Sequence, residues 1–161
     1  HIKSTNWLEN HCYVTLNGIY FLQKKIYLNE KNIAIENVIL KKNADIKIFY
    51  ANFVPQNINE FKNAKVVAFA GIGNPNSFFQ LLKDNNINIF EEIKFPDHYN
   101  YSSEELEMLI KKAKEDKAIL ITTEKDYYRV NESHRKNLNF LKVSFEISNK
   151  NKFFEEIKRI I

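Results

Sequence analysis

Three short polar segments carry the side chains of this sequence that are best suited to chemistry: residues 71–75, 96–99 and 122–126. The second segment places a carboxylate, Asp97, beside an imidazole, His98. Histidine changes charge near neutral pH, so His98 suits proton transfer or the orientation of a carboxylate base. A single histidine is more often incidental than catalytic, and Asp97 could instead cap the residues that follow it. The adjoining carboxylate makes His98 the leading catalytic candidate, with Asp97 as its partner.

The segment 71–75 contains two glycines, Gly71 and Gly73, followed by Asn74. One interpretation is an anion cradle, because glycines let a backbone approach a ligand closely and a helix start offers unpaired N–H groups. The other is a tight turn that needs a positive φ, with Pro75 as the first helical residue. The segment matches neither G-x-x-x-x-G-K-[ST] nor G-x-G-x-x-G, so its spacing favours the structural turn.

The segment 122–126 follows a predicted strand with five polar residues, which are Thr122, Thr123, Glu124, Lys125 and Asp126. In a functional interpretation, Lys125 and the threonine hydroxyls contact a phosphate or a sugar. In a structural one, the segment begins a helix that Thr123 caps, with acidic side chains near the positive end of the helix dipole. The residue types alone leave both interpretations open.

Strands and helices alternate around these segments. Apolar runs predict four strands, at residues 65–70, 87–95, 118–123 and 140–147. Apolar residues three and four apart predict three helices, over residues 77–83, after the Ser-x-x-Glu capping box at Ser102, and over residues 152–161. The alternation predicts an α/β fold, a mostly parallel sheet with helices on both faces. Ligands bind such sheets at the carboxyl ends of the strands, where all three polar segments fall.

Residues 12–50 have a different pattern, with β-branched and aromatic residues between short polar breaks. Asn17-Gly18 is a hairpin signal, and we expect further strands at residues 25–28 and 46–50. The sequence therefore predicts a β-rich lead-in and ribbon over residues 1–50, followed by an α/β lobe over residues 51–161.

The composition limits the possible functions. With 161 residues, 44% of them hydrophobic and 14% aromatic, the chain can build a core. The net charge of +4 is modest, and no Lys/Arg stripe with interleaved aromatics supports nucleic-acid binding. The single cysteine, Cys12, excludes an internal disulfide, and no histidine has metal-ligand spacing, so we expect no metal site. No apolar window reaches the roughly 18 residues of a membrane span. The first residue is His1 rather than Met, so we expect a piece of a longer protein.

Taken in order, three motifs resemble those of the C-terminal half of tetraacyldisaccharide 4'-kinases, the lipid A 4'-kinases. The motifs are residues 66–79, residues 97–98 and residues 122–126. Their order and gaps agree with the family, and the resemblance is strongest over residues 65–130. Each motif alone is weak evidence, whereas the three in order are fairly specific.

The resemblance implies the C-terminal lobe of a P-loop NTPase built from two α/β/α lobes joined by a β ribbon. The family transfers the γ-phosphate of ATP, with Mg²⁺, to the 4'-hydroxyl of tetraacyldisaccharide 1-phosphate in lipid A and lipopolysaccharide biosynthesis. It acts in the cytoplasm, at the inner membrane of Gram-negative-type bacteria. The resemblance implies that His98 orients an aspartate that serves as the general base, and that Asp97 positions His98. It places the remaining candidates at a substrate-binding or inter-lobe rim: Gly71, Gly73, Asn74, Thr122, Thr123, Glu124, Lys125 and Asp126.

The chain departs from the family in what it lacks. It contains no P-loop lysine, Mg²⁺-binding segment, partner aspartate motif or membrane-docking helix, all of which belong to the family's N-terminal lobe. ATP, Mg²⁺ and the membrane surface are then bound mainly by that lobe, and we expect negligible activity from residues 1–161 alone. The alternative is a non-catalytic α/β module that binds a nucleotide, a phosphosugar or a protein. A P-loop upstream in the same reading frame would favour the kinase.

Overall fold

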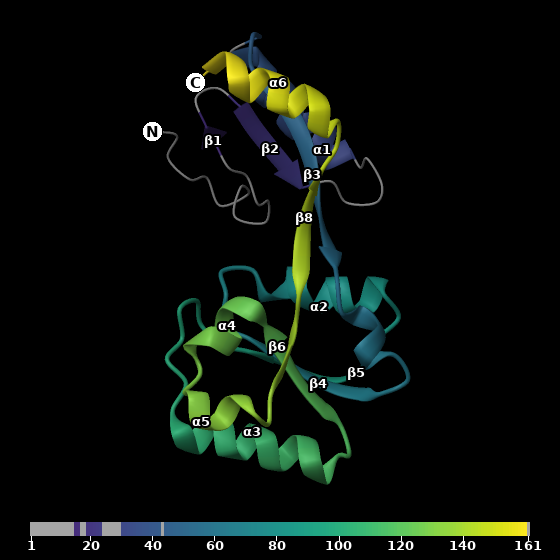
Figure 1. Ribbon diagram of the computed structural model, residues 1–161, viewed down its shortest axis with the longest axis vertical. Coiled ribbons are helices and arrows are strands. Elements are labelled where there is room, and N and C mark those ends of the chain that lie inside the picture. Colours follow the sequence, from purple (N-terminus) through teal and green to yellow (C-terminus); the bar gives the residue numbers. More distant parts are fainter. Residues whose placement is uncertain (1–14, 17–18, 24–29, 43, 161) are drawn as a thin grey trace. The chain divides into compact units, whose positions relative to one another are not determined.

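The chain folds around two four-stranded sheets (Figure 1). The computed structural model describes residues 15–16, 19–23, 30–42 and 44–160. The chain divides into two compact units, the first made of residues 1–54 and 144–161, the second of residues 55–143. Among the described residues, no helix is long and apolar enough to cross a membrane.

The second unit contains the parallel sheet that the sequence predicts. Its strands are β4 (Lys65–Ala70), β5 (Asn88–Lys94), β6 (Ile119–Thr123) and β7 (Asn139–Leu141). Their order is β5-β4-β6-β7, and every neighbouring pair is parallel. The central strand β4 is buried over five of its six residues, as its continuous apolar run predicts.

Helices cover both faces of this sheet, which confirms the predicted fold class (Figure 1). On one face, Val66, Ala68 and Ala70 of β4 pack with the apolar side of α2 (Pro75–Asp84), which is Phe78, Phe79 and Leu82. On the other face, Val67 and Phe69 pack with the apolar side of α3 (Ser103–Glu115), which is Leu106, Leu109, Ile110 and Ala113. Alternate residues of a strand point to opposite faces, so β4 contributes to both apolar cores.

The helix ends follow the predicted capping chemistry. Ser102 and Glu105 form the complete capping box at the start of α3. Pro75 occupies the first turn of α2 behind the cap Asn74. Thr123 caps α4 (Glu124–Arg129). Two shorter helices complete the unit, η1 (Ile58–Phe61) and α5 (Glu132–Arg135).

The first unit contains a mixed sheet. Its strands, in spatial order, are β1 (Thr15–Leu16), β2 (Ile19–Gln23), β3 (Lys47–Pro55) and β8 (Val143–Ile147). Leu16 pairs with Ile19 in an antiparallel register, which confirms the hairpin expected there, while Asn17 and Gly18 lie outside the described residues. The closing helix α6 (Lys150–Ile160) places Phe153 against Phe49 and Ala51 of β3.

A helix, α1 (Glu30–Lys42), replaces the continuous strands and turns expected before residue 50. The β-branched residues of this segment favoured strands, but β2 and β3 pair in parallel. A parallel pair needs a crossover connection of about a dozen residues or more, and α1 lies in that connection. The strand expected at residues 25–28 lies outside the described residues.

The single strand expected at residues 140–147 is also wrong, because the chain breaks at Lys142 into β7 and β8, which belong to different sheets. The Asn57 side chain accepts a hydrogen bond from Lys142 N and donates one to the carbonyl of Phe140. These bonds occupy the Phe140 carbonyl and the Lys142 N–H, which would pair with a neighbouring strand if one continuous strand ran through residues 140–147. Residues 144–161 consequently group with the first unit, whereas the sequence analysis placed them in the lobe 51–161.

The two-faced core of the second unit gives a stability test on one helix. Leu106 is fully buried on α3, whereas Met108 is 63% exposed. Leu106→Ala should lower the free energy of unfolding by about 2–5 kcal/mol, because it leaves a cavity under the sheet. Met108→Ala should change it by no more than about 0.5 kcal/mol. Urea unfolding followed by circular dichroism measures both, and equal effects would contradict the placement of α3.

Candidate functional site

The three polar segments meet at the carboxyl ends of β4, β5 and β6. The N–H of His98 donates to the carbonyl of Gly71 over 3.1 Å, and the N–H of Gly71 donates to Asp126 Oδ2 over 3.0 Å. Because the strands are parallel, residues that follow them are brought to one edge of the sheet. We call residues 71–74, 97–98 and 122–126 the rim.

The carboxylate of Asp126 is fully buried beneath the rim. Its Oδ2 accepts hydrogen bonds from Gly71 N and from the Thr123 hydroxyl, the latter over 2.8 Å. Its Oδ1 lies 3.3 Å from Arg129 Nη1. A buried charge is tolerated when it is paired and hydrogen-bonded, as here. Asp126 therefore ties the loop after β4 to the start of α4.

The threonines of the rim are also engaged within the protein. The buried Thr122 hydroxyl donates to the carbonyl of Phe69 over 2.8 Å. The Thr123 hydroxyl accepts from Asp126 N as it caps α4. These contacts support the helix-start interpretation of residues 122–126. Glu124 is half-buried in the first turn of α4, and Lys125 is exposed, with its Nζ 4.0 Å from Asp97 Oδ1.

The rim glycines are required by close approach rather than by backbone conformation. Neither Gly71 nor Gly73 has a positive φ, so that part of the turn interpretation is wrong. A Cβ on Gly71 would lie 2.6 Å from Tyr101 Oη, and one on Gly73 would lie 3.2 Å from Asp97 Oδ2. Both glycines make room for side chains of the neighbouring loop.

The N-terminus of α2 offers little to an anion. Pro75 has no N–H, and the side chain of Asn74 accepts a hydrogen bond from Ser77 N. These two features remove donors that an anion cradle would use. The geometry of residues 71–75 therefore gives the cradle interpretation no support.

His98 is exposed, yet its backbone is fixed. Its φ of 60° lies in the left-handed region, which is uncommon for a residue with a side chain. The His98 N–H donates to Asp97 Oδ1 over 2.9 Å as well as to Gly71 O. His98 Nε2 is 3.8 Å from Asp97 Oδ2, too far for a hydrogen bond. Asp97 thus holds the backbone of His98 rather than its ring.

Arg129 is the main residue that the sequence analysis missed. Its Nη1 donates to Gly71 O over 3.0 Å, and its Nη2 lies 2.8 Å from His98 Nδ1. The available signal was helical spacing, because a residue three positions after Asp126 on α4 lies on the same face of the helix.

Two tyrosines of the loop after β5 were also missed. Tyr101 packs edge-on against Phe69, and its buried hydroxyl has no hydrogen bond of ordinary geometry among the described residues. Burial, and then the nearby Asp126 carboxylate, raise the pKa of Tyr101. The Tyr99 hydroxyl donates to Glu105 over 2.6 Å, which raises the pKa of Tyr99 and lowers that of Glu105.

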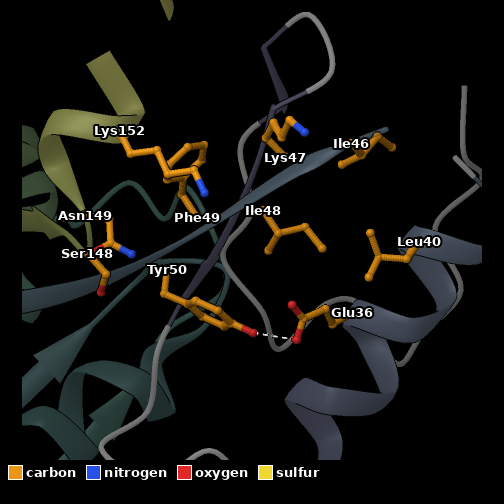
Figure 2. A pocket seen from close by; sticks show the side chains of 10 residues that line it. All are labelled: Glu36, Leu40, Ile46, Lys47, Ile48, Phe49, Tyr50, Ser148, Asn149 and Lys152. Carbon is orange, nitrogen blue, oxygen red and sulfur yellow. Dashed lines mark hydrogen bonds between the residues drawn. The ribbon is translucent and has the colours of Figure 1, made fainter. Parts of the chain in front are cut away.

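A hollow of about 200 Å³ lies elsewhere, in the first unit (Figure 2). Inside it, the Tyr50 hydroxyl donates to Glu36 over 2.7 Å. Burial first, and then this bond, raise the pKa of Tyr50 to about 12. None of the predicted site residues lines the hollow. Within the described part of the chain, no group of three or more His, Cys, Asp or Glu side chains is placed to hold a metal ion.

The family profile and the curated relatives that match this chain all belong to one kinase family. The profile of the family described as Tetraacyldisaccharide-1-P 4'-kinase (LpxK) matches residues 19–161. The Tetraacyldisaccharide 4'-kinase of Pelagibacter ubique (strain HTCC1062) is 37% identical over 129 residues, which cover 78% of this chain and 41% of the relative. That of Rickettsia typhi (strain ATCC VR-144 / Wilmington) is 44% identical over 111 residues, covering 69% of this chain and 34% of the relative.

A solved structure is similar to part of the chain. It is the "apo" form of LpxK from Aquifex aeolicus in complex with ATP, with a TM-score of 0.49 and 26% identity. The match covers 72% of this chain and 37% of that chain. The present chain thus corresponds to between 34% and 41% of the length of the relatives described here.

The contact between Gly71 and Tyr101 gives a test of the rim geometry. Gly71→Ala should destabilise the protein by about 1–3 kcal/mol, because the new methyl group overlaps the Tyr101 hydroxyl. Tyr101→Phe removes that hydroxyl and should recover part of the loss in the double variant. Gly73→Ala is the matched control, since its methyl group meets only the Asp97 side chain and should cost less. Thermal unfolding measures all four proteins, and strict additivity of Gly71→Ala and Tyr101→Phe would contradict the contact.

Proposed function

Because this chain belongs to the tetraacyldisaccharide 4'-kinase family, we propose that it forms the C-terminal lobe of an ATP-dependent lipid kinase. The substrate is tetraacyldisaccharide 1-phosphate, phosphorylated on its 4'-hydroxyl in lipid A biosynthesis. The observation that carries the proposal is the family match over residues 19–161, which includes the whole rim. The activity belongs to a longer protein, since the chain spans less than half the length of its relatives.

The described residues do not by themselves fit ATP or Mg²⁺. The turn at residues 71–75 has no lysine, and its helix start is partly capped by Asn74. No cluster of carboxylates in the described residues suits a divalent cation. We therefore assign the binding of ATP and Mg²⁺ mainly to residues of the enzyme outside this chain. We assign the contact of the enzyme with the cytoplasmic face of the inner membrane to those residues as well.

In this proposal, His98 acts on a carboxylate outside the chain. An aspartate of the complete enzyme accepts the proton of the sugar hydroxyl, and the imidazole N–H of His98 orients and tunes that aspartate. Asp97 supports His98 through the hydrogen bond to its backbone. Phosphoryl transfer depends mainly on positioning and charge stabilisation, so a fixed histidine at the rim is a useful contribution.

The other rim residues contribute in two ways. Lys125 is exposed and carries a positive charge, which suits contact with a phosphate or sugar of the substrate. Gly71, Gly73 and Asn74 shape the edge of the rim that faces the rest of the enzyme. The buried residues Thr122 and Asp126 support that edge from below.

The first test joins the N-terminal part of the Pelagibacter ubique relative to this chain. The chimera should phosphorylate tetraacyldisaccharide 1-phosphate with Mg-ATP, measured as transfer of radiolabelled phosphate to lipid. The chain alone should give no product, because its sequence contains no G-x-x-x-x-G-K-[ST] phosphate-binding loop. Turnover by residues 1–161 alone would contradict the proposal. A folded but inactive chimera would instead favour the non-catalytic binding module.

His98→Ala in the active chimera should lower kcat by roughly 100-fold to 10,000-fold, with a smaller change in the KM for ATP. A base-orienting group acts mainly in the transition state, so kcat takes most of the loss. His134→Ala is the matched control, because His134 contacts Ser133 and Glu107 rather than the rim. An unchanged kcat in His98→Ala would remove the role assigned to this residue.

A further inference from the structure

One guanidinium contacts all three segments of the rim. Arg129 Nη1 donates to Gly71 O over 3.0 Å and lies 3.3 Å from Asp126 Oδ1. Its Nη2 lies 2.8 Å from His98 Nδ1. The Arg129 side chain is 22% exposed, against 70% for His98. A largely buried cation thus holds the ring of an exposed histidine.

The chemistry of the pair fixes which ring nitrogen carries the hydrogen. A guanidinium is always protonated in proteins and has only N–H donors. His98 Nδ1 must therefore accept the hydrogen bond with its lone pair, so the hydrogen of the neutral ring is on Nε2. That Nε2–H is not consumed by Asp97, whose Oδ2 is 3.8 Å away.

The position of Arg129 is itself determined by buried groups. The Asp126 carboxylate accepts hydrogen bonds from Gly71 N and from the Thr123 hydroxyl. These bonds fix the position of the carboxylate that the Arg129 guanidinium contacts. The backbone of His98 is held separately, by Gly71 O and Asp97 Oδ1. Both the backbone and the ring of His98 therefore have hydrogen-bond partners, although its side chain is 70% exposed.

We propose that Arg129 is a positioning residue that holds His98 as the Nε2–H tautomer and presents this N–H to a carboxylate acceptor. The tautomer follows from the contacts of the chain alone, whereas its effect on phosphoryl transfer rests on the proposed function. Arg129 itself touches no reacting atom and acts through His98. The contact with Arg129 orients an exposed imidazole as a hydrogen-bond donor.

Nitrogen-15 NMR of the 161-residue chain tests the tautomer without any activity. The ring signals of His98 are assigned from their loss in His98→Gln, and free histidine measured at the same pH is the reference. In the unaltered chain, the neutral ring should be almost entirely Nε2–H, more so than free histidine. Arg129→Lys keeps the charge near Asp126 but loses the planar fork, and should return His98 towards the free mixture. A predominant Nδ1–H form, or no change in Arg129→Lys, would overturn the proposal.

The kinetics of the chimera test whether Arg129 positions His98 for phosphoryl transfer. Arg129→Lys should lower kcat by roughly 10-fold to 100-fold and leave both KM values nearly unchanged. In the His98→Ala background the same substitution should have little further effect, because Arg129 acts through the ring. Arg135→Lys is the control, since Arg135 contacts the carbonyls of Val130 and Tyr128.

The two experiments separate the possible failures. An inactive chimera with the expected NMR result removes the proposed function and leaves the tautomer assignment standing. An active chimera in which Arg129→Lys keeps its kcat, or adds its full effect to that of His98→Ala, overturns the positioning role. A loss of kcat in Arg129→Lys that is explained entirely by a lower melting temperature also overturns the positioning role.

Discussion

The buried carboxylate of Asp126 is the interaction on which the rim depends. It is fully buried and receives hydrogen bonds from the loop after β4, from the cap of α4 and from the Arg129 guanidinium. Removing one partner of a buried charge pair typically costs about 3–5 kcal/mol, because the remaining charge has lost its solvent as well as its partner. These contacts join the loop after β4 to both ends of α4. The geometry of the rim thus depends on a fully buried group.

The loops of the rim hold one residue, His98, in a strained backbone conformation and pack closely at Gly71. The left-handed backbone of His98 costs on the order of 1–3 kcal/mol and persists only where the surroundings over-determine it. The carbonyl of Gly71 receives hydrogen bonds from both His98 N and Arg129, and it comes from a glycine that has no room for a side chain. The loops after β4 and β5 are therefore joined by close packing and by a backbone hydrogen bond. A strained residue held by such contacts is typical of a functional position.

The sequence predicts this part of the molecule because its signals are local. The apolar run of β4, the capping box at Ser102 and the Thr123 cap each lie within a few residues, and the parallel sheet then brings the polar segments together. Contacts between distant residues were not predictable in the same way. The break at Lys142 depends on Asn57, and the need for Gly71 depends on Tyr101. The helix α1 was missed because its β-branched residues indicate strands, whereas the parallel pairing of β2 and β3 requires a crossover.

The rim motifs divide into residues whose polar atoms are used inside the protein and residues that face outward. Thr122, Thr123 and Asp126 belong to the first group, since their side chains are occupied by the carbonyl of Phe69, the cap of α4 and the buried ion pair. His98 and Lys125 belong to the second. A run of five polar residues after a strand therefore does not predict five ligand contacts. Three of the five, Thr122, Thr123 and Asp126, use their side chains to stabilise the loop and the start of α4. In the proposed function, chemistry at this edge falls to a few exposed groups, and the largely buried Arg129 contacts the ring of one of them, His98.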